Sequence, residues 1–165
     1  MKGTFPGPIQ PMAAVLPGCE ERPSGQPLWG LQRVITVPLT PATVTVASTN
    51  YITGMFVAPS DGWYVEDLFY GAQVVPDYAT STIAVENYDK SATTAKNLLS
   101  ATNENLETLT AKQGRQASLS TTQANRELDE GDTLIVTVAI GASEVVAGKG
   151  IFATVVLRGP EIDPQ

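Results

Sequence analysis

Histidine is absent from this sequence, and cysteine occurs once in its 165 residues. The absence of histidine excludes Ser–His and Cys–His nucleophile pairs, histidine metal ligands and the most common general base. The single cysteine, Cys19, cannot form an internal disulfide or a thiolate zinc site, and we interpret it as an incidental free thiol in a reducing compartment. We therefore expect no catalytic residue, no metal site and no cofactor, and we do not expect an enzyme.

Positive charge is also scarce, because ten Lys and Arg residues stand against seventeen Asp and Glu residues and leave a net charge of −7. The basic residues are scattered and form no stripe that could neutralise phosphates, so direct nucleic-acid binding is not expected. The acidic balance disfavours binding to anionic membranes. No run of about 18 apolar residues is present, and the N-terminus has no continuous apolar segment of the signal-peptide kind. The sequence predicts a chain that is made in the cytoplasm and does not bind a membrane.

Carboxylates are the remaining candidates for site chemistry. Asp129, Glu130 and Asp132 surround Gly131, and we interpret this group as a tight turn whose carboxylates accept backbone N–H bonds. A cation site is the alternative, although calcium needs several converging oxygen ligands and the turn supplies two or three. No phosphate-binding loop is present, because the glycine pair around Lys149 lacks the length and the following Ser or Thr of such a loop.

Residues 1–32 combine six of the twelve prolines with five glycines and contain no periodic apolar run. Proline lacks a backbone donor and glycine is costly to order, so we expect neither a helix nor a strand in this segment. A flexible linker would be polar, whereas this segment has apolar side chains at intervals. We predict an extended arm that lies on a partner surface, with Trp29 as its best anchor. The predicted partner-binding residues are Phe5, Ile9, Val15, Leu16, Leu28, Trp29 and Leu31.

From Arg33 onward the sequence changes to short β-branched and aromatic runs separated by turn residues, which is typical of antiparallel strands. Pro38 and Pro41 bracket the first connection and indicate an edge position or a short hairpin. Residues 59–62 have the composition of a tight β-turn. The strands that these patterns predict are 34–37, 43–46, 55–58, 63–70, 83–88, 134–140 and 151–157.

The segment 91–113 carries two conflicting signals. Its apolar residues approach the helical period of 3.6, but it is rich in Thr and Asn, which are modest helix formers. We leave helix and strand open here, and expect a short strand or helical turn near Leu98 and Leu99, a polar loop, and a strand at 106–110. A further strand is expected at 116–120.

Short strands at this spacing, with almost no helix between them, predict an all-β fold. About eight strands in this length match a jelly-roll-like antiparallel β-sandwich. The predicted organisation is an extended N-terminal arm at 1–32, a sandwich domain at 33–159 and a short tail at 160–165. The chain is long enough for one domain with a real core.

Four aromatic residues lie in one predicted strand. Trp63 and Phe69 would share one face with Val65, and Tyr64 and Tyr70 would share the other, since successive side chains in a strand point to opposite faces. A strand that is apolar on both faces indicates a second cover, supplied by the arm or by a partner subunit. We name Trp63, Tyr64, Phe69 and Tyr70 as candidate subunit contacts. An ordinary core strand and a sugar-stacking surface are the alternatives.

A resemblance to known proteins rests on four segments, 97–102, 106–110, 117–121 and 128–138, and on the Gly131–Asp132 turn that leads into a long Val/Thr strand. A Val/Ala/Gly hairpin at 147–150 then precedes the last strand. Over roughly residues 51–158, the sequence resembles small structural proteins of tailed bacteriophage virions, in particular capsid decoration (cement) proteins with a β-sandwich or jelly-roll domain. No motif in this resemblance is chemically diagnostic.

The resemblance implies a non-enzymatic protein located on the outer surface of a phage capsid, where it would bind the major capsid protein and stabilise the head. Capsid proteins often use extended terminal arms to join neighbours, which agrees with the predicted arm. Decoration proteins at three-fold positions are commonly homotrimers, so we expect a homotrimer. Another phage component (a head fibre, tail or baseplate protein) and a carbohydrate-binding or adhesin-like sandwich are the alternatives.

Overall fold

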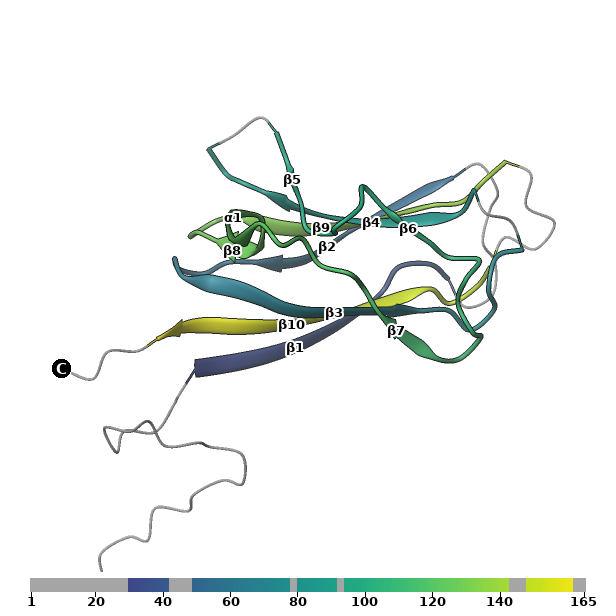
Figure 1. Ribbon diagram of the computed structural model, residues 1–165, viewed down its shortest axis with the longest axis horizontal. Helices are drawn as coiled ribbons and strands as arrows, with labels where there is room; N and C mark the ends of the chain where they lie inside the picture. The colour runs from purple at the N-terminus through teal and green to yellow at the C-terminus, as the bar shows by residue number, and fades with distance from the viewer. Residues whose placement is uncertain (1–29, 42–48, 78–79, 92–93, 143–147, 162–165) are drawn as a thin grey trace, which may run out of the picture.

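The protein is described from a computed structural model, which places residues 30–41, 49–77, 80–91, 94–142 and 148–161. Two antiparallel sheets pack face to face, with their strands roughly aligned along the long axis (Figure 1). The predicted all-β antiparallel sandwich is therefore confirmed. We call the two layers sheet I and sheet II.

Sheet I has the strand order β1-β10-β3-β7, and β8 also pairs with β3. Its strands are β1 (Gly30–Pro38), β10 (Phe152–Glu161), β3 (Trp63–Gly71), β7 (Gly114–Gln116) and β8 (Glu127–Leu128). The short helix α1 (Gln123–Arg126) lies directly before β8. The first and last strands of the described chain are therefore neighbours in the same sheet.

Sheet II has the order β2-β9-β4-β5, and β6 also pairs with β4. Its strands are β2 (Asn50–Val57), β9 (Thr133–Ala139), β4 (Thr82–Tyr88), β5 (Lys96–Asn97) and β6 (Glu104–Asn105). When β5 and β6 are taken as one interrupted strand, and β7 and β8 as another, eight strands remain. Successive strands alternate between the sheets except at β4 and the β5–β6 strand, which are neighbours in sheet II. This alternation is the jelly-roll arrangement.

The core lies between the sheets and follows the period of two along each strand. On β9, for example, Leu134, Val136 and Val138 are buried, and the residues between them are half-buried on the outer face. They meet the inward side chains of sheet I, such as Val155 and Leu157 on β10. Each such side chain contributes roughly 1.5–3 kcal/mol of apolar burial. The β-branched residues of these strands therefore provide both the strand preference and the core.

The ambiguous segment before residue 114 folds as strand-like pieces along the outer edge of β4. Leu98 N–H donates to Val85 O (2.9 Å), and Leu106 N–H donates to Ser81 O (2.9 Å), so two buried leucines fix this segment to sheet II. The strand expected at 106–110 is wrong, because Leu109 N–H donates to Leu106 O (3.2 Å) and the chain turns there. The strand expected at 116–120 is also misplaced. It is the end of β7 followed by an isolated bridge between Leu119 and Leu99.

The limits of the sandwich differ from the expected ones. β1 begins at Gly30, because its ladder with β10 extends from Pro38 opposite Phe152 to Gly30 opposite Glu161. The expected border after residue 32 therefore falls inside β1, and the expected border after residue 159 falls inside β10. Pro38 ends β1, which is an edge strand, as the proline indicated. The strand expected at 43–46 lies outside the described residues. No helix among the described residues is long and apolar enough to span a membrane.

Candidate functional site

The predicted arm residues lie almost entirely outside the part of the chain that the structure describes. Phe5, Ile9, Val15, Leu16, Leu28 and Trp29 are in this group. Leu31 belongs to β1 and lies between Gly30 and Gln32, where the register with β10 shifts. The role of these residues in partner binding thus stays a prediction, and the described candidates are those on β3.

The four aromatic residues of β3 are divided between its two faces differently from the prediction. Trp63 and Tyr70 are both in the core, 3% and 0% exposed, whereas Tyr64 and Phe69 are half-buried on the outer face. The alternation changes phase at a β-bulge, where Asp67 pairs with Val156 and Val65 pairs with Leu157. One extra residue on β3 therefore moves all later side chains to the opposite face.

This finding corrects the prediction that β3 is apolar on both faces. Trp63 and Tyr70 are core residues and do not offer an accessible subunit contact in this chain. Tyr64 and Phe69 remain on the outside. The missed signal is the acidic pair Glu66–Asp67, which sits between two apolar alternations, 63/65 and 68/70, that are out of phase with each other.

Arg126, the last residue of α1, completes the edge of β3 beside this bulge. Its Nε donates to Val65 O (2.9 Å) and its Nη2 donates to Glu66 O (2.8 Å). These carbonyls lie between the stretch of β3 that pairs with β8 and the stretch that pairs with β7. Ala117 N–H satisfies the next carbonyl, Leu68 O, at 2.8 Å. A side chain thus continues the hydrogen bonding of the sheet across a gap in its neighbouring strand.

The outer face of sheet I carries a polar network centred on Tyr64. The guanidinium carbons of Arg126 and Arg158 lie over the Tyr64 ring, 4.7 and 5.3 Å from its centroid. Glu66 lies 3.7 Å from Arg158 and accepts a hydrogen bond from Gln32 at 3.2 Å. Cation–π contacts of this kind contribute about 0.5–1 kcal/mol at exposed sites. A sugar would have to compete with these cations in order to stack on this ring.

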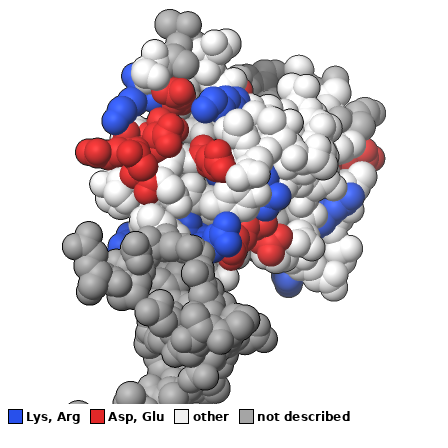
Figure 2. Space-filling model, turned by 60° about the vertical axis from the view of Figure 1, so that its left-hand side comes forward, with Lys and Arg blue, Asp and Glu red and all other residues white. Residues whose placement is uncertain are grey.

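A hollow of about 280 Å³ lies beside this network, between the first residues of β3 and the α1–β8 segment. It combines an arginine, two carboxylates and an amide with two aromatic residues. Its lining residues are Gly62, Trp63, Tyr64, Gln123, Glu127, Leu128, Asp129 and Arg158. Figure 2 shows acidic and basic side chains side by side on the end of the molecule that is turned forward. This mixed charge provides no single-sign site for an anion or a cation.

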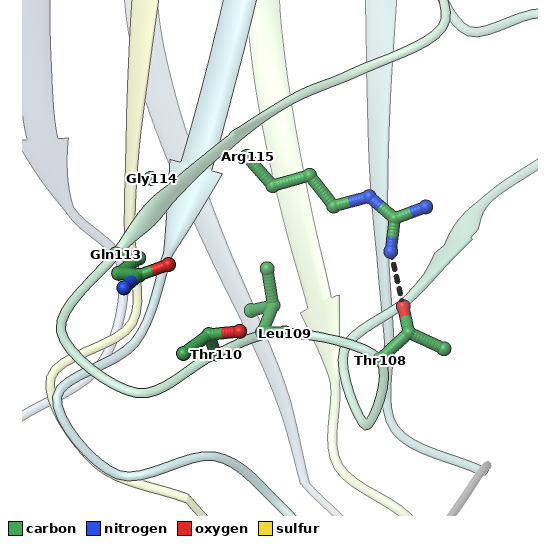
Figure 3. A pocket seen from close by; sticks show the side chains of 6 residues that line it. All are labelled: Thr108, Leu109, Thr110, Gln113, Gly114 and Arg115. Atoms are coloured by element: carbon green, nitrogen blue, oxygen red, sulfur yellow. Dashed lines mark hydrogen bonds between the residues drawn. The ribbon is translucent and has the colours of Figure 1, made fainter.

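The second hollow, of about 310 Å³, is at the start of β7 and is lined by Thr108, Leu109, Thr110, Gln113, Gly114 and Arg115 (Figure 3). Arg115 extends across it and donates from Nη1 to Thr108 Oγ1. The lining has one charged group, and no carboxylate, thiol or imidazole faces that group. In the described residues, no three His, Cys, Asp or Glu side chains are grouped so that they could hold a metal ion.

The phenol of Tyr70 joins the two sheets. It donates to Glu104 Oε2 on β6 at 2.9 Å, and Glu104 Oε1 accepts Ser118 N–H at 3.0 Å. Burial first, and then the hydrogen bond and charge of Glu104, raise the pKa of Tyr70 to about 12. The phenol is therefore neutral at physiological pH, and the group acts as a structural cross-link.

The acidic turn before β9 is structural, as the sequence indicated. The buried carboxylate of Asp132 accepts Asp129 N–H (3.1 Å) and Lys90 N–H (3.2 Å). Gly131 has φ +88°, a region that favours glycine, and its N–H donates to Ala58 O (2.8 Å). The carboxylate of Asp61, on the turn before β3, accepts Glu130 N–H at 2.6 Å. The two turns are thus tied together at the same end of the sandwich.

The structure places Trp63 and Tyr70 in the core, Tyr64 in a polar network and Phe69 half-buried on the outer face of sheet I. Sequence reasoning identified the acidic turn and the aromatic strand, and it missed the role of Arg126, because nothing local in the sequence marks the strand that this side chain completes. Comparison of the chain with models of known protein families and with curated proteins finds no match.

Proposed function

We propose that this chain is a non-enzymatic structural protein of a virion, in particular a decoration protein on the outer surface of a tailed-phage head, where it binds the major capsid protein. The observation that carries the proposal is that one chain combines a folded sandwich with a preceding segment of very different composition. A jelly-roll sandwich begins at Gly30, and the 29 residues before it are rich in proline and apolar side chains and have no helical or strand period.

The sandwich supports the proposal because the described residues form a core between its two sheets. The buried cluster extends from Leu39 to Leu157 and draws side chains from both sheets. Phe5, Ile9 and Trp29 lie outside the described residues, and we predict that they contact a partner. An extended segment with apolar side chains gains stability when it lies on a partner, and it can cover a large area there.

The described charged groups also fit a structural role better than a catalytic one. Arg126, Asp132 and Glu104 each accept or donate hydrogen bonds that connect strands or turns. Catalysis by carboxylates requires a cleft in which one group is free to exchange a proton. The two hollows described above are small, and each is lined by one charged group or by groups of mixed charge. The same features are compatible with a head fibre, tail or baseplate protein.

Co-sedimentation tests the proposal. Full-length chain would be incubated with DNA-emptied heads and, separately, with tails prepared from the phage that encodes it, and bound chain would be measured after centrifugation. Saturable binding to heads, in a fixed ratio to the major capsid protein, is the expected result. Binding to tails alone would instead place the chain in the tail or baseplate.

A matched pair of variants separates specific attachment from trapping in the pellet. Trp29→Ala alters the predicted anchor, and Thr121→Ala changes an exposed residue in the loop before α1. Only Trp29→Ala should lower the amount bound. Absence of the chain from heads and tails, together with binding to immobilised oligosaccharides, would contradict the proposal and favour a carbohydrate-binding sandwich.

A further inference from the structure

The four outer edges of the two sheets are protected unequally. The outer edge of β3 is covered by β7, β8, Ala117 and Arg126. The outer edge of β4 is covered by β5, β6, Leu98 and Leu106. The remaining edges belong to β1 and β2, and among the described residues each of these strands pairs on one side only. An edge strand in this state presents a row of unpaired N–H and C=O groups to other chains.

The open edges of β1 and β2 lie on the same side of the sandwich. β1 is the outermost strand of sheet I and β2 is the outermost strand of sheet II, and the two strands are in contact across the sandwich. We call this side, formed by Gly30–Pro38 and Asn50–Val57, the β1–β2 side. The opposite side carries all of the short covering strands.

Each open edge carries an exposed apolar side chain at a residue whose backbone faces outward. Leu39 N–H donates to Ile151 O, and Ile140 N–H donates to Thr49 O. Antiparallel ladders alternate from residue to residue, so the backbone groups of Val34 and Ile52 point away from their paired strands. Their side chains are 64% and 68% exposed. Natural edge strands are usually protected by Lys or other charged residues at such positions.

The strands beside the β1–β2 side carry few charged residues, and this favours a second copy of the chain as the partner. The four strands next to this side, β1, β10, β2 and β9, contain only Arg33, Arg158 and Glu161 as charged residues. The chain as a whole has a net charge of −7, so its acidic residues are concentrated elsewhere. A second copy of an acidic chain can therefore approach the β1–β2 side without bringing carboxylates together. Interfaces are similarly depleted of charged residues at their centres.

We propose that the β1–β2 side is the surface through which copies of this chain associate, with the backbone edges of β1 and β2 pairing with those of a second copy. A second copy can complete these edges, because its own β1 and β2 carry the same outward backbone groups, which no other described strand pairs with, and the same few charged residues. This surface replaces the contact expected at Trp63 and Tyr70. The homotrimer expected from the sequence is one assembly that it can form, and the proposal holds independently of attachment to a virion.

Light scattering of the full-length chain, with variants of the two edges, tests this proposal. The variant Val34→Lys with Ile52→Lys places a positive charge on each open edge. Ser100→Lys with Thr121→Lys adds the same two charges at exposed positions on the covered side. The wild type and the control pair should form one discrete oligomer at micromolar concentration. In the edge pair the dissociation constant should rise by about tenfold or more, because like charges brought together across an interface are strongly unfavourable.

Circular dichroism and thermal melting of the edge pair show whether it remains folded. Amide hydrogen exchange then reports on the edges themselves. The amides of Val34 and Ile52 should become protected as the wild-type concentration rises through the association range. A monomeric wild type would overturn the proposal, as would an oligomer that the edge pair leaves intact. Protection of both amides in a dilute monomer would also overturn it, because it would show that the chain covers these edges with its own residues.

Discussion

Tyr70 on β3 donates its phenolic hydrogen to Glu104 on β6, at 2.9 Å, and this bond crosses from sheet I to sheet II. Its pKa is raised to about 12, first by burial and then by Glu104. The ordinary value is 10, so the folded state holds this proton more tightly than the unfolded state does. The resulting stabilisation is present below pH 10 and is lost as the pH rises toward 12.

The first prediction concerns Tyr70→Phe. The substitution leaves a Glu104 oxygen without its donor, and it should lower the free energy of unfolding at pH 7 by about 1–3 kcal/mol. It should also flatten the decline in stability between pH 10 and pH 12. Urea unfolding across this range measures both effects. Tyr88→Phe is the control, because Tyr88 is exposed and its hydroxyl donates to Glu86 in its own strand. Equal effects of the two variants would show that the cross-sheet bond is unimportant.

The second prediction concerns the side chain that completes the β3 edge. Arg126→Ala should destabilise the fold by about 2–3 kcal/mol, because two carbonyls lose charged donors and the Tyr64 ring loses a cation. Arg126→Lys should recover only part of this loss, since an ammonium group cannot reproduce the fixed fork of a guanidinium. Urea unfolding is the measurement. Arg115→Ala, which removes an exposed arginine from β7, should change stability little, and full recovery by lysine would contradict the geometric argument.

The third prediction concerns the acidic turn. Asp132→Ala should lower the free energy of unfolding by about 1–3 kcal/mol, because the N–H groups of Asp129 and Lys90 lose their acceptor. Asp129→Ala removes an exposed carboxylate from the same turn and should have a much smaller effect. Added calcium should not shift the melting temperature of the wild type. A clear calcium-dependent increase, lost in Asp132→Ala, would instead show that the turn is a cation site.

The fourth prediction concerns the residues before the sandwich. A chain that begins at Gly30 should melt within a few degrees of the full-length chain, because the described strands supply buried side chains from both sheets. Its binding to phage heads should be weaker. Differential scanning calorimetry and co-sedimentation measure the two effects. An unfolded product would show that residues 1–29 are part of the core.

The fifth prediction concerns the expected anchor. Trp29→Ala should weaken attachment to heads by about 2 kcal/mol or more if Trp29 is a binding hot spot. Attachment should persist at moderate salt, because the predicted contact is apolar and the chain is acidic. If Trp29 instead covers the end of the sandwich, the substitution would lower the melting temperature of the isolated protein and leave attachment of the folded fraction unchanged. Calorimetry and binding, measured on the same variant, distinguish the two roles.

Periodic segments of the sequence predicted their structure well. β9 and β10 are runs of apolar and β-branched residues that follow turn residues, and both strands overlap the ranges predicted from this pattern. The acidic turn was predicted for a similar reason, since its residue types satisfy local backbone groups.

Non-local features could not be predicted in the same way. The bulge at Glu66–Asp67 reverses the faces of β3, and its position depends on the register of the neighbouring strand β10. The short pieces β5 and β6 have too few residues to show any period, and they are fixed by tertiary contacts of Leu98 and Leu106. The role of Arg126 likewise depends on a strand about sixty residues away in the sequence.

The pairing of β1 with β10 has a consequence for synthesis. Val34 lies opposite Val156 and Pro38 lies opposite Phe152. In sheet I, β10 lies between β1 and β3, so both strands gain this neighbour only after β10 has been synthesised. Until then, β1 and β3 have no partner between them. Closing a loop of this length is slow, and the exposed strands are prone to aggregation in the interval. Sheet II, whose strands all precede β10, can assemble first and serve as the template on which sheet I closes.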